Sequence, residues 1–139
     1  MERIVIDTNV YIDWMNEGRH ETILFQREAV KYLSAVVLME LLAGAFSLGD
    51  RRLVQEVTSA FAKVGRILAP TASIYEEAGD VLRRLQTTRG YTMASAYGLT
   101  NDVLIALSAR SIGATVITQN EQDFVAIQTI RPFKMALVP

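Results

Sequence analysis

Short apolar runs alternate with longer segments in which apolar residues recur at every third or fourth position. The short runs are rich in β-branched residues, which is typical of buried strands. We predict such strands over residues 3–8, 30–33, 66–68 and 114–118, with one edge strand near residues 127–130. The segments between them have the spacing of amphipathic helices, so the alternation predicts an α/β fold with a mostly parallel sheet.

The helical spacing gives approximate bounds for five helices. They are predicted over residues 10–16, 35–46, 72–86 and 100–111, and from Gly49-Asp50 to residue 64. Residues 18–21 are predicted to form a turn, and residues 87–99, which contain two glycines and lack a clear period, a loop. Residues 119–124 are predicted to be a loop or one helical turn.

Length and composition limit the class of protein. With 139 residues, 50% of them hydrophobic and 21% charged, the chain is expected to form one globular domain over residues 1–139. It has no cysteine, which excludes a disulfide scaffold, a thiolate zinc site and a cysteine nucleophile. We see no signal peptide, and the apolar runs are too short to span a membrane, so we expect a cytoplasmic protein with no membrane partner.

The net charge of −1 gives no overall basic field of the kind that attracts nucleic acid. The basic residues are nevertheless unevenly chosen, with eleven arginines against three lysines. Arginine suits bidentate phosphate contacts better than lysine does. Ordinary surface charge is the simpler interpretation of this excess when it is taken alone.

Acidic and small polar side chains follow two of the predicted strands. Asp7 ends the first strand, and Asn120 and Asp123 follow the strand at residues 114–118. In parallel sheets, ligands bind beyond the carboxyl ends of the strands, near a switch in strand order. The sequence therefore predicts a ligand site at this edge of the sheet.

Two further acids lie in apolar surroundings. Glu40 is the only charge in the helix over residues 35–46, where an isolated buried carboxylate is costly and requires a partner or a shifted pKa. A narrow exposed stripe or an arginine partner would also explain it. Asp102 precedes an apolar helical run, where capping of a helix N-terminus is the competing explanation.

Together these acids indicate a metal site. If Asp102 also faces the carboxyl edge, four carboxylates converge there, and their repulsion requires a cation. Mg²⁺ is a hard cation that takes a few carboxylates and keeps water ligands, and such water is a better nucleophile for phosphoryl chemistry. Other mechanisms of phosphoryl chemistry lack the residues they need. His20 is the only histidine, which excludes acid–base cleavage of RNA by a histidine pair. No glycine-rich phosphate loop is present, and Asn9 stands where a D-x-D phosphatase would need an aspartate.

At these residues the chain resembles PIN-domain proteins, specifically the VapC-type toxin ribonucleases of toxin–antitoxin pairs. The resemblance is carried, in order, by "IVIDTNVYID", "YLSAVVLMELLAG", "LTNDVLIALSARSIGATVIT" and "TQNEQDF", which together span nearly the whole chain. It implies a PIN-like α/β/α sandwich and cleavage of RNA that depends on Mg²⁺ or Mn²⁺. The implied catalytic and metal-binding acids are Asp7, Glu40, Asp102 and Asp123, supported by Thr8, Asn9, Thr118 and Asn120. In many relatives the fourth acid matches the position of Asn120, so either Asn120 or Asp123 takes that place.

The same resemblance implies an RNA substrate, a homodimer and inhibition by a cognate antitoxin protein. Side chains flanking residues 87–99 are candidates for contacts with RNA phosphates and bases: Arg83, Arg84, Arg89, Tyr91 and Tyr97. An exposed helix end and loop would explain these residues equally well. Two other functions stay open, a non-catalytic RNA- or protein-binding module of the same fold and a metal-dependent nuclease that acts on DNA.

Overall fold

The computed structural model describes residues 1–138 and contains a five-stranded sheet in the order β3-β2-β1-β4-β5. All four strand pairs are parallel, which confirms the predicted sheet. The strands are β1 (Glu2–Ile6), β2 (Ala29–Ser34), β3 (Ile67–Leu68), β4 (Thr115–Thr118) and β5 (Lys134–Leu137). The strands β2 and β3 lie in succession on one side of β1, and β4 and β5 lie in succession on its other side, so the strand order switches at β1.

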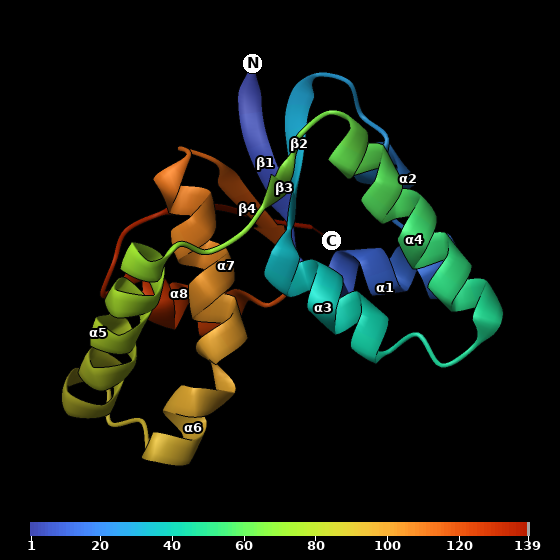
Figure 1. Ribbon diagram of the computed structural model, residues 1–139. Helices are drawn as coiled ribbons and strands as arrows, with labels where there is room; N and C mark the ends of the chain where they lie inside the picture. Colours follow the sequence, from blue (N-terminus) through green and yellow to red (C-terminus); the bar gives the residue numbers. More distant parts are fainter. Residues whose placement is uncertain (139) are drawn as a thin grey trace.

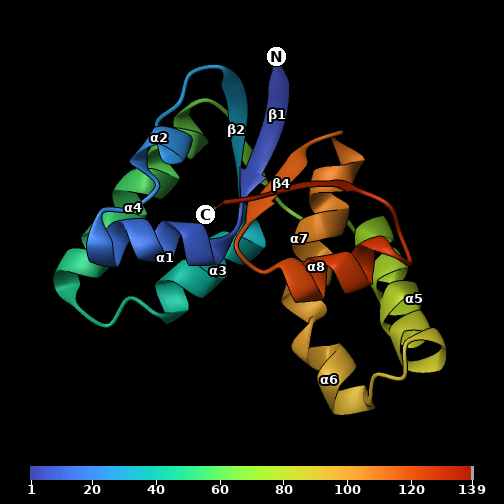
Figure 2. The same cartoon turned by 180° about the vertical axis from the view of Figure 1, so that it is seen from behind.

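Helices cover both faces of the sheet, as expected of an α/β/α sandwich (Figures 1 and 2). One face carries α1 (Thr8–Glu17), α2 (Glu21–Leu24), α3 (Ala35–Ala43) and α4 (Leu48–Lys63). The other face carries α5 (Ala72–Thr88), α6 (Met93–Gly98), α7 (Thr100–Ser111) and α8 (Glu121–Gln128). Within residues 1–138, every helix is too short or too polar to cross a lipid bilayer.

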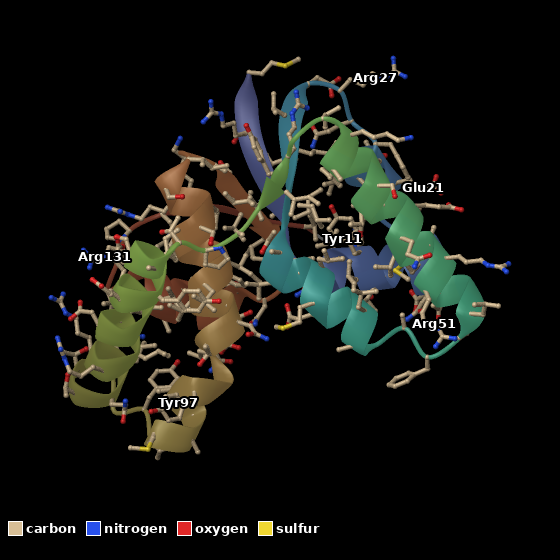
Figure 3. All side chains as sticks on the ribbon, in the orientation of Figure 1. Tyr11, Glu21, Arg27, Arg51, Tyr97 and Arg131 are labelled. Carbon is tan, nitrogen blue, oxygen red and sulfur yellow. The ribbon has the colours of Figure 1, made fainter. Side chains whose placement is uncertain are left out.

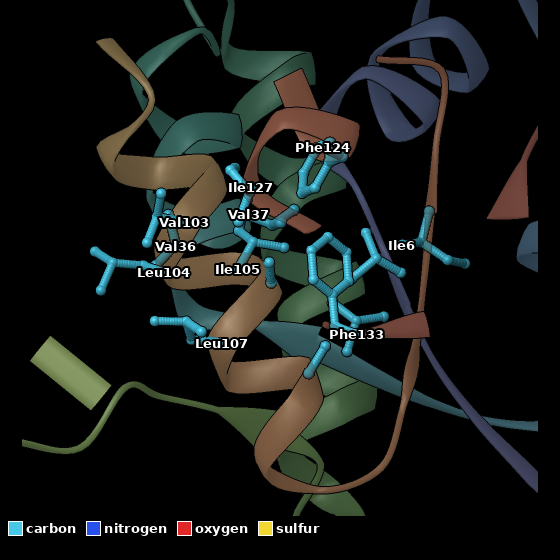
Figure 4. Close-up of a cluster of buried hydrophobic side chains, with 14 of the residues drawn as sticks. Ile6, Val36, Val37, Val103, Leu104, Ile105, Leu107, Phe124, Ile127 and Phe133 are labelled. Carbon is cyan, nitrogen blue, oxygen red and sulfur yellow. The ribbon is translucent and has the colours of Figure 1, made fainter. Parts of the chain in front are cut away.

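The core is built around β1 and α7. Ile4, Val5 and Ile6 of β1 are buried, and α7 is buried without interruption from Val103 to Ala109. Figure 4 shows the α7 side chains packed among residues of other elements, including Phe124 and Phe133, whose rings meet edge to face. Because close packing leaves little freedom to move, β1 and α7 are rigid supports for the polar residues at their ends.

Several predicted bounds shift by a few residues, and the shift at β1 has a clear cause. The strand stops at Ile6 because Asp7 is the N-cap of α1, its carboxylate accepting a hydrogen bond from the backbone N–H of Thr8. The helix predicted over residues 35–46 ends at Ala43, and a short helix, α2, follows the predicted turn at residues 18–21.

Two predictions were wrong. The loop expected over residues 87–99 contains α6, which Thr92 caps through the N–H of Ser95 and which buries Ala96 alone. The edge strand expected near residues 127–130 belongs instead to α8 and the turn after it, because Phe124 and Ile127 lie one turn apart on a buried helical face. The edge strand, β5, begins after Pro132 and Phe133.

Candidate functional site

The centre of the candidate site is Asp7, at the carboxyl end of the central strand. Its side chain is only 4% exposed. One carboxylate oxygen accepts from the N–H of Thr8 over 2.8 Å, and the other accepts from the Thr118 hydroxyl at the end of β4 over 2.7 Å. These two hydrogen bonds hold Asp7 between the ends of β1 and β4, where the order of strands in the sheet switches.

Glu40 reaches the same edge from α3. Its Oε1 accepts from the hydroxyl of Thr8 over 2.7 Å, and its Oε2 lies 3.5 Å from the side-chain nitrogen of Asn101 on α7. Both neighbours are uncharged. The arginine partner considered from the sequence is therefore not what holds this carboxylate.

The side chain of Asn120 lies between the carboxylates of Asp102 and Asp123. The side-chain nitrogen of Asn120 lies 3.4 Å from Asp102 Oδ2 and 3.0 Å from Asp123 Oδ2. Asn120 is also the N-cap of α8, because its Oδ1 accepts from the N–H of Asp123 over 3.4 Å. Asn120 and Asp123 therefore both face Asp102, with the amide placed between the two acids.

Burial and mutual repulsion change the acidity of two of these groups. Burial raises the pKa of Asp7 above its ordinary value, despite the hydrogen bonds that favour its charged form. Burial, followed by the charges of Asp7, Asp123 and Glu40, raises the pKa of Asp102 to about 7. All three other acids are thus close enough to Asp102 to oppose its ionisation.

The arrangement fits a hard divalent cation. Among residues 1–138 the ion pairs are made by other acids, namely Asp13, Glu17, Glu77 and Asp80, while the four site acids accept from uncharged donors. Within this part of the chain, no three Asp, Glu or His side chains lie in a geometry that already forms a metal site. The Oδ1 atom of Asn9, next to Thr8, is buried without a hydrogen-bond partner. Carboxylates without a basic partner, and amide oxygens, are the kinds of donor that Mg²⁺ or Mn²⁺ prefers.

Helix termini add favourable charge. Asp7 caps α1, Asp102 lies in the first turn of α7, and Asp123 lies in the first turn of α8. The partial positive charge at each helix N-terminus offsets part of the repulsion between the carboxylates.

The five residues predicted to contact RNA lie on α5, α6 and the segment between them. Arg83 and Arg84 both pair with Asp80 on their own helix. Arg89 is the C-cap of α5, and Tyr91 is half-buried against the core. Tyr97 is 60% exposed and points outward from α6 (Figure 3). Of these side chains, Arg89 and Tyr97 are the ones that face solvent without an ion-pair partner in the described structure.

Sequence reasoning missed two polar residues, one that contacts the site and one that adjoins it. Asn101 approaches Glu40. Gln119, between Thr118 and Asn120, contacts Asp13 and His20, and the side chain of His20 is only 7% exposed. The position of Asn101 next to Asp102 could have indicated that it lies near the acids. No pattern in the sequence around Gln119 indicates its contact with α1.

Comparison with known proteins gives the family and the fold. Residues 4–129 match the PIN domain family. The fold is similar to a chain of VapBC2 from Rickettsia felis bound to a promoter DNA fragment, with 22% identity, 99% of each chain covered and a TM-score of 0.68. It is also similar to a chain of DNA-bound VapBC from Salmonella typhimurium, with 22% identity, 99% and 98% covered, and a TM-score of 0.69.

A third similar structure is VapBC-5 from Mycobacterium tuberculosis, described as a member of the VapBC family of toxin-antitoxin systems. The identity is 21%, the similarity covers 99% of this chain and 100% of that chain, and the TM-score is 0.69. No curated protein sequence matches the chain. At these identities the structural likenesses establish the fold.

Proposed function

This chain belongs to the PIN domain family, and from that membership and the geometry of its acids we propose that it is a metal-dependent endoribonuclease toxin. The observation that carries the proposal is the gathering of Asp7, Glu40, Asp102 and Asp123 at one sheet edge without a basic partner among the described residues. Asp7 is buried and the other three acids are half-buried, and a purely structural role would be expected to pair such charges with arginine or lysine.

The four acids would hold Mg²⁺ or Mn²⁺, with Asn120 close by. The bound cation supplies activation of water for hydrolysis and neutralises charge that develops on the phosphoryl oxygens. Not every acid needs to touch the ion, since Mg²⁺ keeps several water ligands.

The other residues of the site orient the acids. Thr118 holds one oxygen of Asp7, and Thr8 holds one oxygen of Glu40, which leaves the remaining lone pairs available to a cation. Asn120 keeps Asp102 and Asp123 apart while donating to both. Because the pKa of Asp102 is about 7, this carboxyl carries a proton in part of the metal-free protein near neutral pH and releases it when a cation binds.

The proposed reaction is hydrolysis of an RNA phosphodiester without participation of the 2′-hydroxyl. Attack by the 2′-hydroxyl usually uses a base and an acid of the histidine kind, and His20 is the sole histidine. It contacts Asp13 and Gln119 and none of the four acids. The oxygen of water bonds to phosphorus, the bond to the 3′-oxygen breaks, and that oxygen takes a proton. The products carry a 5′-phosphate and a 3′-hydroxyl.

The substrate is proposed to be single-stranded or structured RNA that passes α6. Tyr97 offers an exposed ring for base stacking, and Arg89 offers a guanidinium for a phosphate. The chain runs from α6 through Leu99 directly into α7, so Tyr97 lies only five positions before Asp102.

The deciding experiment incubates the purified protein, free of antitoxin, with a pool of cellular RNAs in Mg²⁺, Mn²⁺ or chelator and maps the ends. We expect cleavage with either metal, 5′-phosphate ends, no cleavage in chelator and none with Asp7→Asn. Cleavage of DNA alone would identify a DNA nuclease. Metal-dependent RNA or protein binding without cleavage would identify a non-catalytic module. Ends with 2′,3′-cyclic phosphate would contradict the proposed hydrolysis.

A cognate antitoxin is the proposed protein partner, because similar structures are of VapBC complexes and one is described as a toxin-antitoxin system. A groove of about 300 Å³ between α1, α2 and α4 suits an apolar segment of such a partner. Its walls include Trp14, Phe25 and Phe61, and Lys31 and Arg66 line it as well. Phe61→Glu should weaken antitoxin binding while RNA cleavage is retained.

A homodimer is the second proposed assembly. Met39 and Leu42 on α3 and Phe46 just after it are exposed, Phe46 to 87%. Contiguous exposed apolar side chains of this kind are typical of surfaces that contact another chain. The dimer is independent of the catalytic proposal and is tested separately below.

A further inference from the structure

A polar cluster lies beside the four acids and contacts none of them. It consists of Asp13 on α1, His20 just before α2, and Gln119 just after β4. The side-chain nitrogen of Gln119 lies 2.8 Å from Asp13 Oδ2 and 2.8 Å from His20 Nε2. Arg19 approaches the same carboxylate from the solvent side, at 3.8 Å. The cluster joins two chain segments that are about a hundred positions apart.

The donors and acceptors of this cluster fix the direction of one contact. A carboxylate only accepts, so the amide nitrogen of Gln119 faces Asp13 and donates to it. His20 Nε2 lies within reach of both Gln119 and the Asp13 carboxylate, which is 3.5 Å away. These contacts hold the pKa of Asp13 below its ordinary value, and the hydrogen bond from Gln119 contributes most to that lowering.

The backbone at His20 shows that this contact is maintained against strain. His20 has a φ of 67° and is the one non-glycine residue with a positive φ within residues 1–138. Such a conformation persists where the surroundings hold it in place. Here it turns the imidazole inward, where it is 7% exposed and contacts Asp13 and Gln119.

Gln119 lies between two residues that orient the acids. On one side, Thr118 donates to Asp7 and accepts from the N–H of Asn120 over 2.9 Å. On the other side, Asn120 donates to Asp102 and Asp123. Gln119 itself lies between the end of β4 and the start of α8, in neither a strand nor a helix. The contacts of its side chain with Asp13 and His20 therefore help to fix the direction of the chain at this point.

We propose that Gln119 is a positioning residue of the acid site, anchored by Asp13 and His20 so that Thr118 and Asn120 hold the carboxylates in the geometry that binds the metal. This inference rests on the proposed function, because it concerns the same acids. Partners that orient metal ligands at one remove typically contribute about 10–100-fold to metal affinity. Gln119 acts through such partners, so we expect an effect of about 10-fold, at the lower end of that range.

The test measures Mn²⁺ affinity by titration calorimetry at a temperature where each protein is folded. Gln119→Leu keeps the approximate side-chain size and removes the donor, and it should bind Mn²⁺ about 10-fold more weakly than the original protein. In RNA cleavage at saturating substrate, kcat should fall at a fixed low Mn²⁺ concentration and recover at high Mn²⁺. KM for RNA should stay unchanged, because Gln119 is not proposed to touch the substrate.

Three further variants separate positioning from general stability. Arg19→Ala removes the solvent-side ion pair and leaves the bond from Gln119 to Asp13, so it should bind Mn²⁺ as the original protein does. Asp13→Asn keeps an oxygen acceptor for Gln119 and should retain most of the affinity, whereas Asp13→Leu should lose as much as Gln119→Leu. The double variant Asp13→Leu/Gln119→Leu should be no worse than either single variant, because both remove the same bond.

The outcomes are distinguishable. If the original protein binds no Mn²⁺, the proposed metal-dependent function fails and this inference fails with it. If it binds Mn²⁺ and Gln119→Leu binds equally well, the acid site stands and the positioning role of Gln119 is overturned. If Gln119→Leu does not fold, the comparison of Asp13→Asn with Asp13→Leu decides, and equal affinities of that pair overturn the inference.

Discussion

The hydroxyl of Thr118 donates to Asp7 Oδ2 over 2.7 Å, although 111 positions separate the two residues in the chain. The bond joins the ends of β4 and β1, the neighbouring strands between which the order of strands in the sheet switches. Both residues are buried, so the hydrogen bond compensates a carboxylate that is only 4% exposed.

Removing this hydroxyl should therefore damage both stability and metal binding. Thr118→Val leaves one oxygen of Asp7 unsatisfied, and we expect a loss of about 1–3 kcal/mol in the free energy of unfolding. Urea unfolding at pH 7 without metal measures this loss. Thr118→Ser keeps the hydroxyl and is the matched control, which should lose clearly less. Equal losses from the two variants would assign the effect to the missing methyl group.

The raised pKa of Asp102 predicts how the stability of the metal-free protein depends on pH. In the unfolded chain this carboxyl has its ordinary pKa of 3.8, whereas in the folded protein its pKa is about 7. Between these values the folded state binds more protons, so the free energy of unfolding should decrease as pH rises from about 4 to about 7. Asp102→Asn should flatten this decrease in a series of urea titrations. An unchanged slope in the variant would contradict the assignment to Asp102.

The same proton predicts a pH dependence of metal binding. Because a cation must displace the proton from Asp102, Mn²⁺ affinity should increase as pH rises through about 7. Calorimetry in two buffers with different enthalpies of ionisation would detect the released proton. Binding without proton release near pH 6.5 would show that Asp102 is already ionised in the metal-free protein.

Glu40 should matter for metal binding and little for the fold. Glu40→Gln keeps the acceptor oxygen that Thr8 uses and removes one of the repelling charges, so the metal-free protein should be as stable as before or slightly more stable. Its affinity for Mg²⁺ or Mn²⁺ should fall. A large loss of stability with unchanged metal affinity would instead show that Glu40 serves as a buried structural partner.

Divalent metal should stabilise the folded protein, because the acids come together only after folding. At a metal concentration 100 times the dissociation constant, the gain is about 2.7 kcal/mol. Thermal unfolding with Mg²⁺, with Mn²⁺ and with chelator measures it. The gain should disappear in Asp7→Asn, and equal melting temperatures in all three conditions would argue against a metal site.

The exposed apolar residues near α3 predict the oligomeric state. If Leu42 and Phe46 lie in a homodimer interface, Leu42→Glu/Phe46→Ser should sediment as a monomer at micromolar concentration, where the original protein sediments as a dimer. Val125→Glu, on α8 and the opposite face of the sheet, is the control and should remain dimeric. A monomeric original protein would remove the dimer and leave the catalytic proposal intact.

The strongest signals in the sequence were those in which one residue contradicts its neighbours. Asp7 after three buried strand residues and Glu40 alone in an apolar helix both stood out for this reason. Asp102 did not stand out, because an aspartate in a first helical turn is also a common capping residue. Only the packing of α7 against β1 and β4 directs it toward the other acids.

Features that depend on residues far apart in the chain could not be predicted from local sequence patterns. The helix α6 was missed because it buries only Ala96 and so lacks an amphipathic period. The contact of Gln119 with Asp13 bridges 106 positions, and neither residue differs in its local sequence from an ordinary surface polar residue. The position of β5 was missed because its residues are mostly exposed and have no strong apolar alternation.

The order of strands in the sheet has a consequence for synthesis of the chain on the ribosome. The central strand β1 is made before its neighbour β4 (Thr115–Thr118) and before the edge strand β5 (Lys134–Leu137). Until β4 emerges, one edge of β1 has no partner, and Asp7 lacks the hydrogen bond from Thr118. The four acids therefore come together only after β4 and the start of α8 have been made, so a product that stops before β4 cannot carry the proposed site.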